Sequence, residues 1–154
     1  MEKYKGNPGS PAQRIAALLD KMNSPALTEK GRHAAAARLT DQMRGDVRFL
    51  LTAFPKKQYA DEDVIRPDQL KKAHRIFDQN GQQFLPLYVS EEDIAYFRKG
   101  LEKGECIYLC DKKDILDFLL LNNDVAAIIN PVKNGLLVYP AELKNLIWSQ
   151  EHLR

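Results

Sequence analysis

Apolar side chains recur at helical spacing close to the start of the chain. The first stripe follows the spacing i, i+3, i+4 and i+7 and comprises Ile15, Leu18, Leu19 and Met22. Such spacing places all four side chains on one face of a helix. Residues 10–13, Ser-Pro-Ala-Gln, have the form of a capping box with proline at the first helical position. We therefore expect a short helix that Ser10 caps, that begins at Pro11 and that Asn23-Ser24-Pro25 ends.

A second helix is predicted from about Pro25 or Thr28 to about Arg44. The run Ala34–Ala37 consists of strong helix formers, and its small side chains permit close packing against another helix. The sequence thus predicts a pair of helices before residue 45, preceded by a flexible lead-in over residues 1–9.

The next segments alternate between strand and loop patterns. Val47–Phe54 is apolar and partly β-branched, which predicts a strand, and the polar run Lys56–Pro67 predicts a surface loop. Leu70–Phe77 fits either a helix or one strand of a hairpin. We favour the hairpin, because Asn80-Gly81 is a strong turn signal and Phe84–Val89 follows as a second strand.

Helix and strand patterns alternate through the C-terminal half. Strands are expected at Glu105–Cys110, Val125–Ile129 and Leu136–Tyr139. Helices are expected after the cap residues Ser90 and Asp111, and again from Pro140. The stripe of the first of these helices comprises Ile94, Phe97 and Leu101, with its end at Lys99-Gly100 or Lys103-Gly104. The apolar stripe of the helix that begins at Pro140 comprises Leu143, Leu146, Ile147 and Leu153.

This order of elements predicts an α+β fold, a mixed β-sheet with packed helices that is preceded by the N-terminal helical pair. We expect two parts, an N-terminal helical extension at residues 1–45 and an α+β domain at residues 46–154. A chain of 154 residues with 44% hydrophobic content can bury a core without disulfides or a structural metal.

Charge is distributed unevenly along the chain. Residues 1–83 carry a net charge of +5 and residues 84–154 a net charge of −3. The basic residues are interspersed with acids, whereas nucleic-acid binding usually needs a tighter basic stripe, so we do not expect a nucleic-acid partner. Without a long apolar run or a leader pattern, we expect no membrane association and a cytoplasmic location.

Two short motifs, Phe84–Glu92 and Val125–Pro131, resemble signatures of the bacterial SseB family, the enhanced-serine-sensitivity proteins. Phe84–Glu92 is similar to a strand-to-helix signature of the family's N-terminal domain, with Tyr88 where the family usually has Phe. Val125–Pro131 is similar to its strand-to-turn signature. The resemblance covers about Phe49–Trp148. It implies a bacterial cytoplasmic protein, linked to serine sensitivity, that binds other proteins in an adaptor or immunity-type role rather than catalysing a reaction.

The residues with catalytic or metal-binding potential do not form a recognisable set. Cys106 and Cys110 would lie about 13 Å apart on one side of a strand, too far for a disulfide or a shared zinc ion. The histidines at 33, 74 and 152 do not belong to a nucleophile motif. Three acidic clusters, at 61–63, 91–93 and 111/114/117, fit a solvated loop, helix capping and a solvated helix face. We expect no catalytic residues, no metal site and no cofactor.

The loop Asn130–Gly135 is the best candidate for a binding site. Asn130 and Pro131 can fix the turn, and Asn134 with Gly135 can supply positive φ angles. Loops at strand ends are common ligand sites in open sheets. We therefore expect a non-enzymatic domain that binds a protein partner at a surface edged by this loop and the hairpin. A small-molecule sensor, such as one for amino acids, is the alternative, and homo-oligomer formation through the N-terminal helices remains open.

Overall fold

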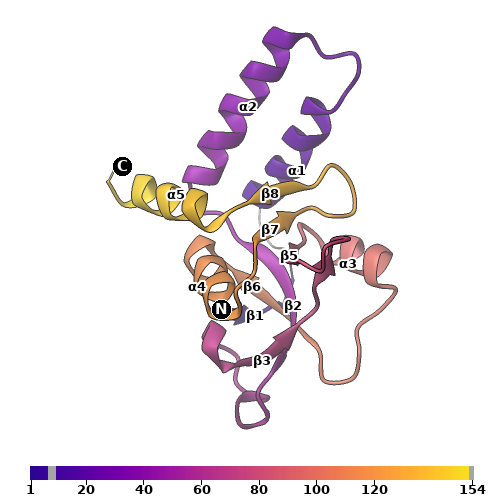
Figure 1. Cartoon of the computed structure of the whole chain (residues 1–154), viewed down its shortest axis with the longest axis vertical. Coiled ribbons are helices and arrows are strands. Elements are labelled where there is room, and N and C mark those ends of the chain that lie inside the picture. The colour runs from indigo at the N-terminus through magenta and orange to yellow at the C-terminus, as the bar shows by residue number, and fades with distance from the viewer. Residues whose placement is uncertain (7–9, 153–154) are drawn as a thin grey trace.

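Two four-stranded sheets and five α-helices make up the fold in a computed structural model that describes residues 1–6 and 10–152 (Figure 1). The described part leaves out residues 7–9, the side chain of Ser10 and Leu153. The predicted cap at Ser10 and the place of Leu153 in the apolar stripe of the last helix therefore lie outside the described residues. The α+β class with an N-terminal helical pair is confirmed. The strands are divided between two sheets rather than gathered in one.

Sheet A is antiparallel and has the order β1-β6-β2-β3. Its strands are β1 (Glu2–Lys3), β6 (Cys106–Cys110), β2 (Phe49–Pro55) and β3 (Leu70–Ala73). β1 pairs with β6 through Glu2 opposite Leu109. The predicted flexible lead-in is therefore wrong for residues 2 and 3, which find backbone partners more than 100 positions away.

Sheet B has the order β4-β5-β7-β8, with β5 and β7 parallel and the outer pairs antiparallel. Its strands are β4 (Ile76–Phe77), β5 (Gln83–Leu87), β7 (Ala126–Ile129) and β8 (Leu136–Val138). The two sheets meet where the N–H and C=O groups of Leu50 and Tyr88 exchange hydrogen bonds of 2.8 and 2.9 Å.

The helices are α1 (Ser10–Met22), α2 (Glu29–Arg44), α3 (Glu91–Arg98), α4 (Lys112–Asn122) and α5 (Pro140–His152). Thr28, Ser90 and Asp111 each accept a hydrogen bond from a backbone N–H in the first turn of the helix that follows, as N-caps do. The expected caps at Ser90 and Asp111 are confirmed, and Thr28 is the start of the second helix.

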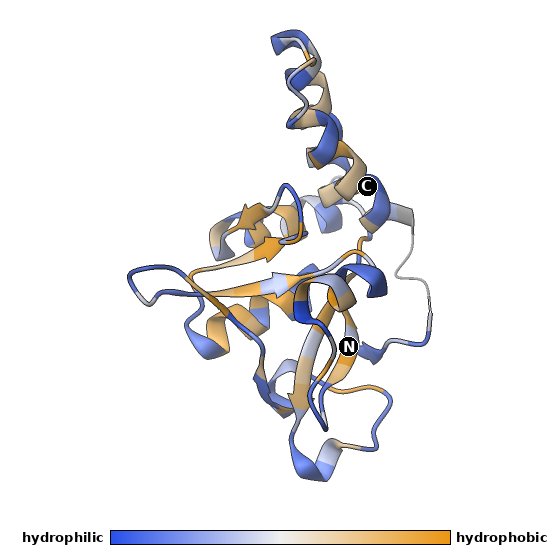
Figure 2. Cartoon of the chain, turned by 90° about the vertical axis from the view of Figure 1, so that its right-hand side faces the viewer, coloured by the Kyte–Doolittle hydropathy of each residue, from blue (hydrophilic) through white to orange (hydrophobic). Residues whose placement is uncertain are grey.

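The helical pair α1–α2 stands out from the two sheets in both views (Figures 1 and 2). One face of each helix joins the main core, through Ala12, Ile15 and Leu19 of α1 and Leu39 and Met43 of α2. The C-terminal end of α2 is also held by Lys112, whose buried Nζ donates to the carbonyls of Met43 and Gly45 at 2.6 and 2.5 Å.

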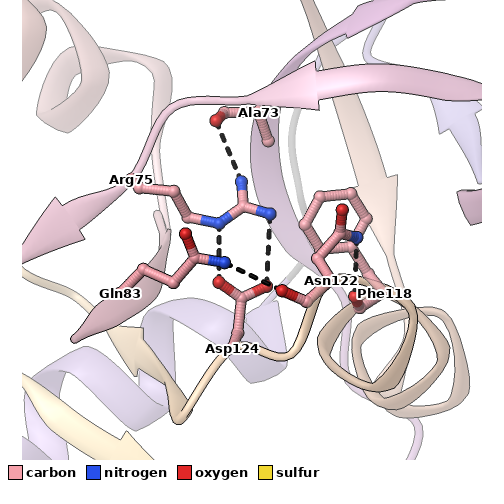
Figure 3. A network of polar contacts seen from close by, with 6 residues as sticks. All are labelled: Ala73, Arg75, Gln83, Phe118, Asn122 and Asp124. Atoms are coloured by element: carbon pink, nitrogen blue, oxygen red, sulfur yellow. Dashed lines mark hydrogen bonds and ion pairs between the residues drawn. The ribbon is translucent and has the colours of Figure 1, made fainter.

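The passage of the chain from sheet A to sheet B is fixed by a buried polar network (Figure 3). Arg75 follows β3 and donates to the buried carboxylate of Asp124 at 2.7 and 3.2 Å, and to the carbonyl of Ala73 at 2.9 Å. Its guanidinium lies 4.6 Å from the ring centroid of Phe118. Nearby, Gln83 donates to the carbonyl of Asn122. The network holds β4 and β5 against the end of α4.

The segment Leu70–Phe77 is strand rather than helix, but in two pieces. Ile76 and Phe77 pair with Phe84 and Gln83 across the Asn80-Gly81 turn, which confirms the favoured hairpin. The preceding residues form β3 and pair with β2 of the other sheet.

Two other local expectations are wrong. Helix α3 ends at Arg98, with Lys99 in the left-handed region at φ 55°, which confirms Lys99-Gly100 of the two expected ends. Leu101 therefore lies beyond the helix and is exposed, so its place in the apolar stripe was wrong. The predicted loop Lys56–Pro67 includes the 3-10 turn η1 (Lys57–Tyr59), and Pro67 opens a second, η2 (Pro67–Gln69). This segment is not wholly a surface loop, because Ile65 and Pro67 are buried.

Candidate functional site

A groove of about 290 Å³ lies between α2, β8 and α5. The groove is lined by Leu39, Thr40 and Met43 of α2, by all three residues of β8, and by Glu142, Asn145 and Leu146 of α5. Six of these nine residues are apolar. Helix α2 and the last helix thus form the two walls, and the last strand of sheet B lies between them.

The groove follows the edge of β8 rather than one face of the sheet. Consecutive side chains of a strand point to opposite faces. Leu136 and Val138 belong to the main core or pack against it, whereas Leu137 is 42% exposed. A hollow that borders all three residues must run along the backbone of the strand, and β8 is the outermost strand of its sheet.

The loop that precedes β8 is a rigid turn. Asn130 is buried at φ 59°, and its side-chain amide donates to the carbonyl of Lys133 at 2.6 Å. Asn134 has φ 55° and donates to Asp20 of α1 at 2.8 Å. The predicted site residues Asn130, Pro131, Asn134 and Gly135 therefore lie together, with both asparagine amides engaged within the chain. The groove begins one residue later, at Leu136.

The expected positive φ of Gly135 is wrong: Asn130 and Asn134 supply the left-handed positions of this loop. Gly135 instead lies so close to Ile128 and Asn130 that a side chain at this position would be crowded. A Cβ atom at this position would lie 3.0 Å from Cγ2 of Ile128 and 3.6 Å from the carbonyl oxygen of Asn130. The glycine thus allows the loop to pass close to β7 before β8 begins.

A second cluster of polar groups lies where the two sheets meet, beneath Phe97 of α3. The ring centroid of Phe97 is 6.3 Å from that of His74 and 6.0 Å from that of Tyr88. Within the described part of the chain, the buried His74 Nδ1 and Tyr88 Oη atoms have no hydrogen-bond partner. Burial, and then the charge of Arg98, lower the pKa of His74, and burial raises the pKa of Tyr88 to about 12.

The same cluster contains a buried ion pair. Arg98 donates to both carboxylate oxygens of Glu105, at 2.6 and 2.9 Å, and to the hydroxyl of Thr52 at 2.9 Å. The Glu105 side chain is fully buried, and that of Arg98 is 9% exposed. The backbone N–H of Glu102 donates to Glu105 as well, at 3.0 Å. The pair therefore presents one cation and one anion close to the unpartnered atoms of His74 and Tyr88.

The residues that the sequence identified for redox or metal chemistry are dispersed. Cys106 and Cys110 are both free thiols, and burial raises the pKa of Cys110. Asp111 and Asp114 form a reciprocal capping box at the start of α4. Over residues 1–6 and 10–152, no three His, Cys, Asp or Glu side chains are grouped in a way that could hold a metal ion.

Comparison with known proteins gave no relative: no family model and no curated protein matches this chain. Among the described helices, none has the length and apolar composition needed to cross a membrane.

The groove itself was missed by the sequence reasoning. Its one local signal was the uncharged segment Leu136-Leu137-Val138 between a turn and a helix. The walls of the groove give no local signal, because α2 and α5 meet through residues about 100 positions apart in the sequence.

Proposed function

We propose that this chain is a protein-binding domain that acts without catalysis, and that the groove between α2, β8 and α5 receives the partner. The observation that carries the proposal is the apolar lining of this groove beside the outermost strand of sheet B. Exposed apolar surface in a hollow is typical of interaction sites. Leu137 and Tyr139, both more than two-fifths exposed, add to that surface.

The rigidity of the surroundings supports the same proposal. Partner binding is stronger when the receiving surface is already ordered, because less conformational entropy is lost. The loop before β8 is fixed by the side chains of Asn130 and Asn134. The start of α5 is fixed by Glu142, which accepts a hydrogen bond from the N–H of Tyr139.

The proposal is tested by filling the groove without disturbing the core. Asn145 is an exposed residue of the α5 wall, and Asn145→Trp places an indole in the groove; Lys144→Trp puts the same side chain outside the lining. Each variant and the parent chain are immobilised and exposed to a bacterial lysate, and bound proteins are identified by mass spectrometry. We expect at least one specific partner to bind the parent and the Lys144 variant but not the Asn145 variant.

Circular dichroism and the melting temperature verify that both variants remain folded. A partner that binds all three chains equally would overturn the groove as the docking surface. Specific turnover of a metabolite by the purified chain, with no partner captured, would overturn the protein-binding function itself.

The biological setting forms part of the proposal and rests on the sequence resemblance alone. We place the chain among SseB-like proteins of the bacterial cytoplasm, in an adaptor or immunity-type role.

A second candidate function, small-molecule sensing, is favoured by the polar cluster beneath Phe97. Buried groups without partners are costly, and a bound polar molecule would remove that cost at Tyr88 Oη and His74 Nδ1. Thermal-shift measurement with the twenty amino acids tests this candidate: a true ligand raises the melting temperature of the parent chain. It should raise that of Tyr88→Phe less. No shift with any of them would exclude amino-acid sensing.

A further inference from the structure

The four outer strands of the two sheets differ in how their edges are protected. Natural sheets guard their edges with charged residues, very short strands, bulges or a covering segment. β1 and β4 are two residues long, and β1 is also bridged by Val64 through Glu2. β3 carries the exposed Lys71 and Lys72 and a register shift against β2. β8, by contrast, is Leu-Leu-Val in regular register, with no charge, proline or bulge.

The hydrogen-bond pattern of sheet B shows which backbone groups of β8 face outward. The N–H of Asn130 donates to the carbonyl of Leu87, so Asn130 and Ile128 direct their backbone groups toward β5. Because the direction of the backbone groups alternates along a strand, the N–H and C=O groups of Ala127 and Ile129 point toward β8. These two residues pair with Val138 and Leu136.

The intervening residue, Leu137, therefore turns its N–H and C=O away from β7 and toward the groove. The outward N–H of Tyr139, two residues on, is occupied by the Glu142 carboxylate at 3.1 Å. This contact agrees with the same alternation. The open part of the edge thus centres on the donor and acceptor of Leu137.

The walls of the groove restrict the charge of an occupant. Glu142 is the single charged residue in the lining, and its carboxylate already accepts the Tyr139 N–H. Leu39, Met43 and Leu146 offer apolar contacts on the two sides. A negatively charged segment would gain no counter-ion here, and a positively charged one would find only the Glu142 carboxylate. Either would lose hydration, whereas uncharged apolar side chains would gain burial.

We propose that the groove receives an extended, uncharged segment of the partner protein, which adds to sheet B as a fifth strand beside β8. This inference rests on the proposed function and specifies how the partner is recognised. Backbone hydrogen bonds to Leu137 hold the segment in place, and its alternate apolar side chains contact α2 and α5. Strand addition at an exposed sheet edge is an established mode of peptide recognition.

The test selects ligands without assuming a partner. A library of random twelve-residue peptides is displayed on phage and selected for binding to the full chain, and peptides that also bind the Asn145→Trp variant are removed. We expect the remaining peptides to share apolar residues at positions i and i+2, the period of a strand. N-methylation of the peptide nitrogen facing Leu137 should weaken binding about tenfold, and methylation of the next nitrogen should have no such effect.

Each outcome separates this inference from the proposed function. Apolar spacing of i, i+3 and i+4 would mean that a helix occupies the groove, which overturns strand addition but retains the docking surface. Peptides that bind regardless of Asn145→Trp, or no peptides at all, would count against both. Sedimentation of the parent and the Asn145 variant adds a last outcome: a dimer lost in the variant would show that a second copy takes the edge, and would overturn the partner-segment inference.

Discussion

Glu105 is a carboxylate whose burial and hydrogen bonds oppose each other. Burial raises its pKa. The hydrogen bonds from Arg98 and from the backbone of Glu102, together with the charge of Arg98, lower the pKa by more than burial raises it, so it lies below the ordinary value of 4.5. A carboxylate with a depressed pKa in the folded state stabilises the fold above its unfolded-state pKa. That contribution is lost as the pH falls through the folded-state pKa.

Glu105→Gln should therefore destabilise the chain at pH 7 by about 3 kcal/mol, because Arg98 is left buried without its counter-charge. At pH 3, below the ordinary glutamate pKa of 4.5, the difference between the parent and the variant should shrink, because the unfolded parent takes up a proton that the depressed pKa of folded Glu105 disfavours. Urea unfolding at the two pH values measures both effects. Glu102→Gln, at an exposed position, is the control and should change the free energy of unfolding by less than about 0.5 kcal/mol. An equal cost for Glu105→Gln at both pH values would show that the charge of Glu105 is not what stabilises the pair.

At the scale of elements, the turn before β8 depends on two separate properties of Asn130. Its φ of 59° lies in the region that other L residues enter at a cost, and its amide satisfies the Lys133 carbonyl. Asn130→Gly removes the hydrogen bond and keeps the favourable φ, and should cost about 1 kcal/mol. Asn130→Ala adds the backbone strain, and should cost about 2 kcal/mol in all.

Thermal or urea unfolding of both variants separates the cost of the lost hydrogen bond from the cost of the strained backbone. Lys133→Ala, at an exposed side chain of the same loop, is the control. Equal costs for glycine and alanine would show that the left-handed backbone contributes nothing to the stability of this turn.

The elements that the sequence predicted well are those whose signals are local. Ser90 and Asp111 bind N–H groups three residues away, and the Asn80-Gly81 turn joins adjacent strands, so no distant residue is needed to recognise them. The division into two sheets occurs at His74-Arg75 and depends on the pairing of Arg75 with Asp124, 49 residues later. Residues 130–135 form the turn that their sequence predicted. The groove beside this turn requires α2 and α5 to meet, and no local pattern reports that contact.

For the whole molecule, Lys112 is a buried polar link between the helical pair and the rest of the fold, in addition to the hydrogen bond from Asn134 to Asp20. It is almost fully buried at the start of α4, and its Nζ binds two carbonyls at the end of α2. Lys112→Met keeps the length of the side chain but leaves both carbonyls without this donor, and should lower the free energy of unfolding by about 2 kcal/mol. Urea unfolding measures the loss.

Lys113→Met, one residue along and exposed, is the matched control and should differ from the parent by less than about 0.5 kcal/mol. If Lys112→Met proves as stable as the parent, Lys112 does not hold the helical pair in place, and the pair's apolar contacts and the Asn134–Asp20 hydrogen bond suffice.

The order of strands in sheet A also bears on when the protein can fold. β6 lies between β1 and β2, so the two N-terminal strands do not touch each other and are joined only once residues 106–110 are present. A ribosome releases the chain from the N-terminus, and contacts between distant positions form slowly. During synthesis β2 consequently has only β3 and the Tyr88 bridge as sheet partners until two-thirds of the chain has emerged. Apolar residues such as Phe49 and Leu51 therefore lack part of their final cover in the nascent chain until then, at the stage when chaperones act.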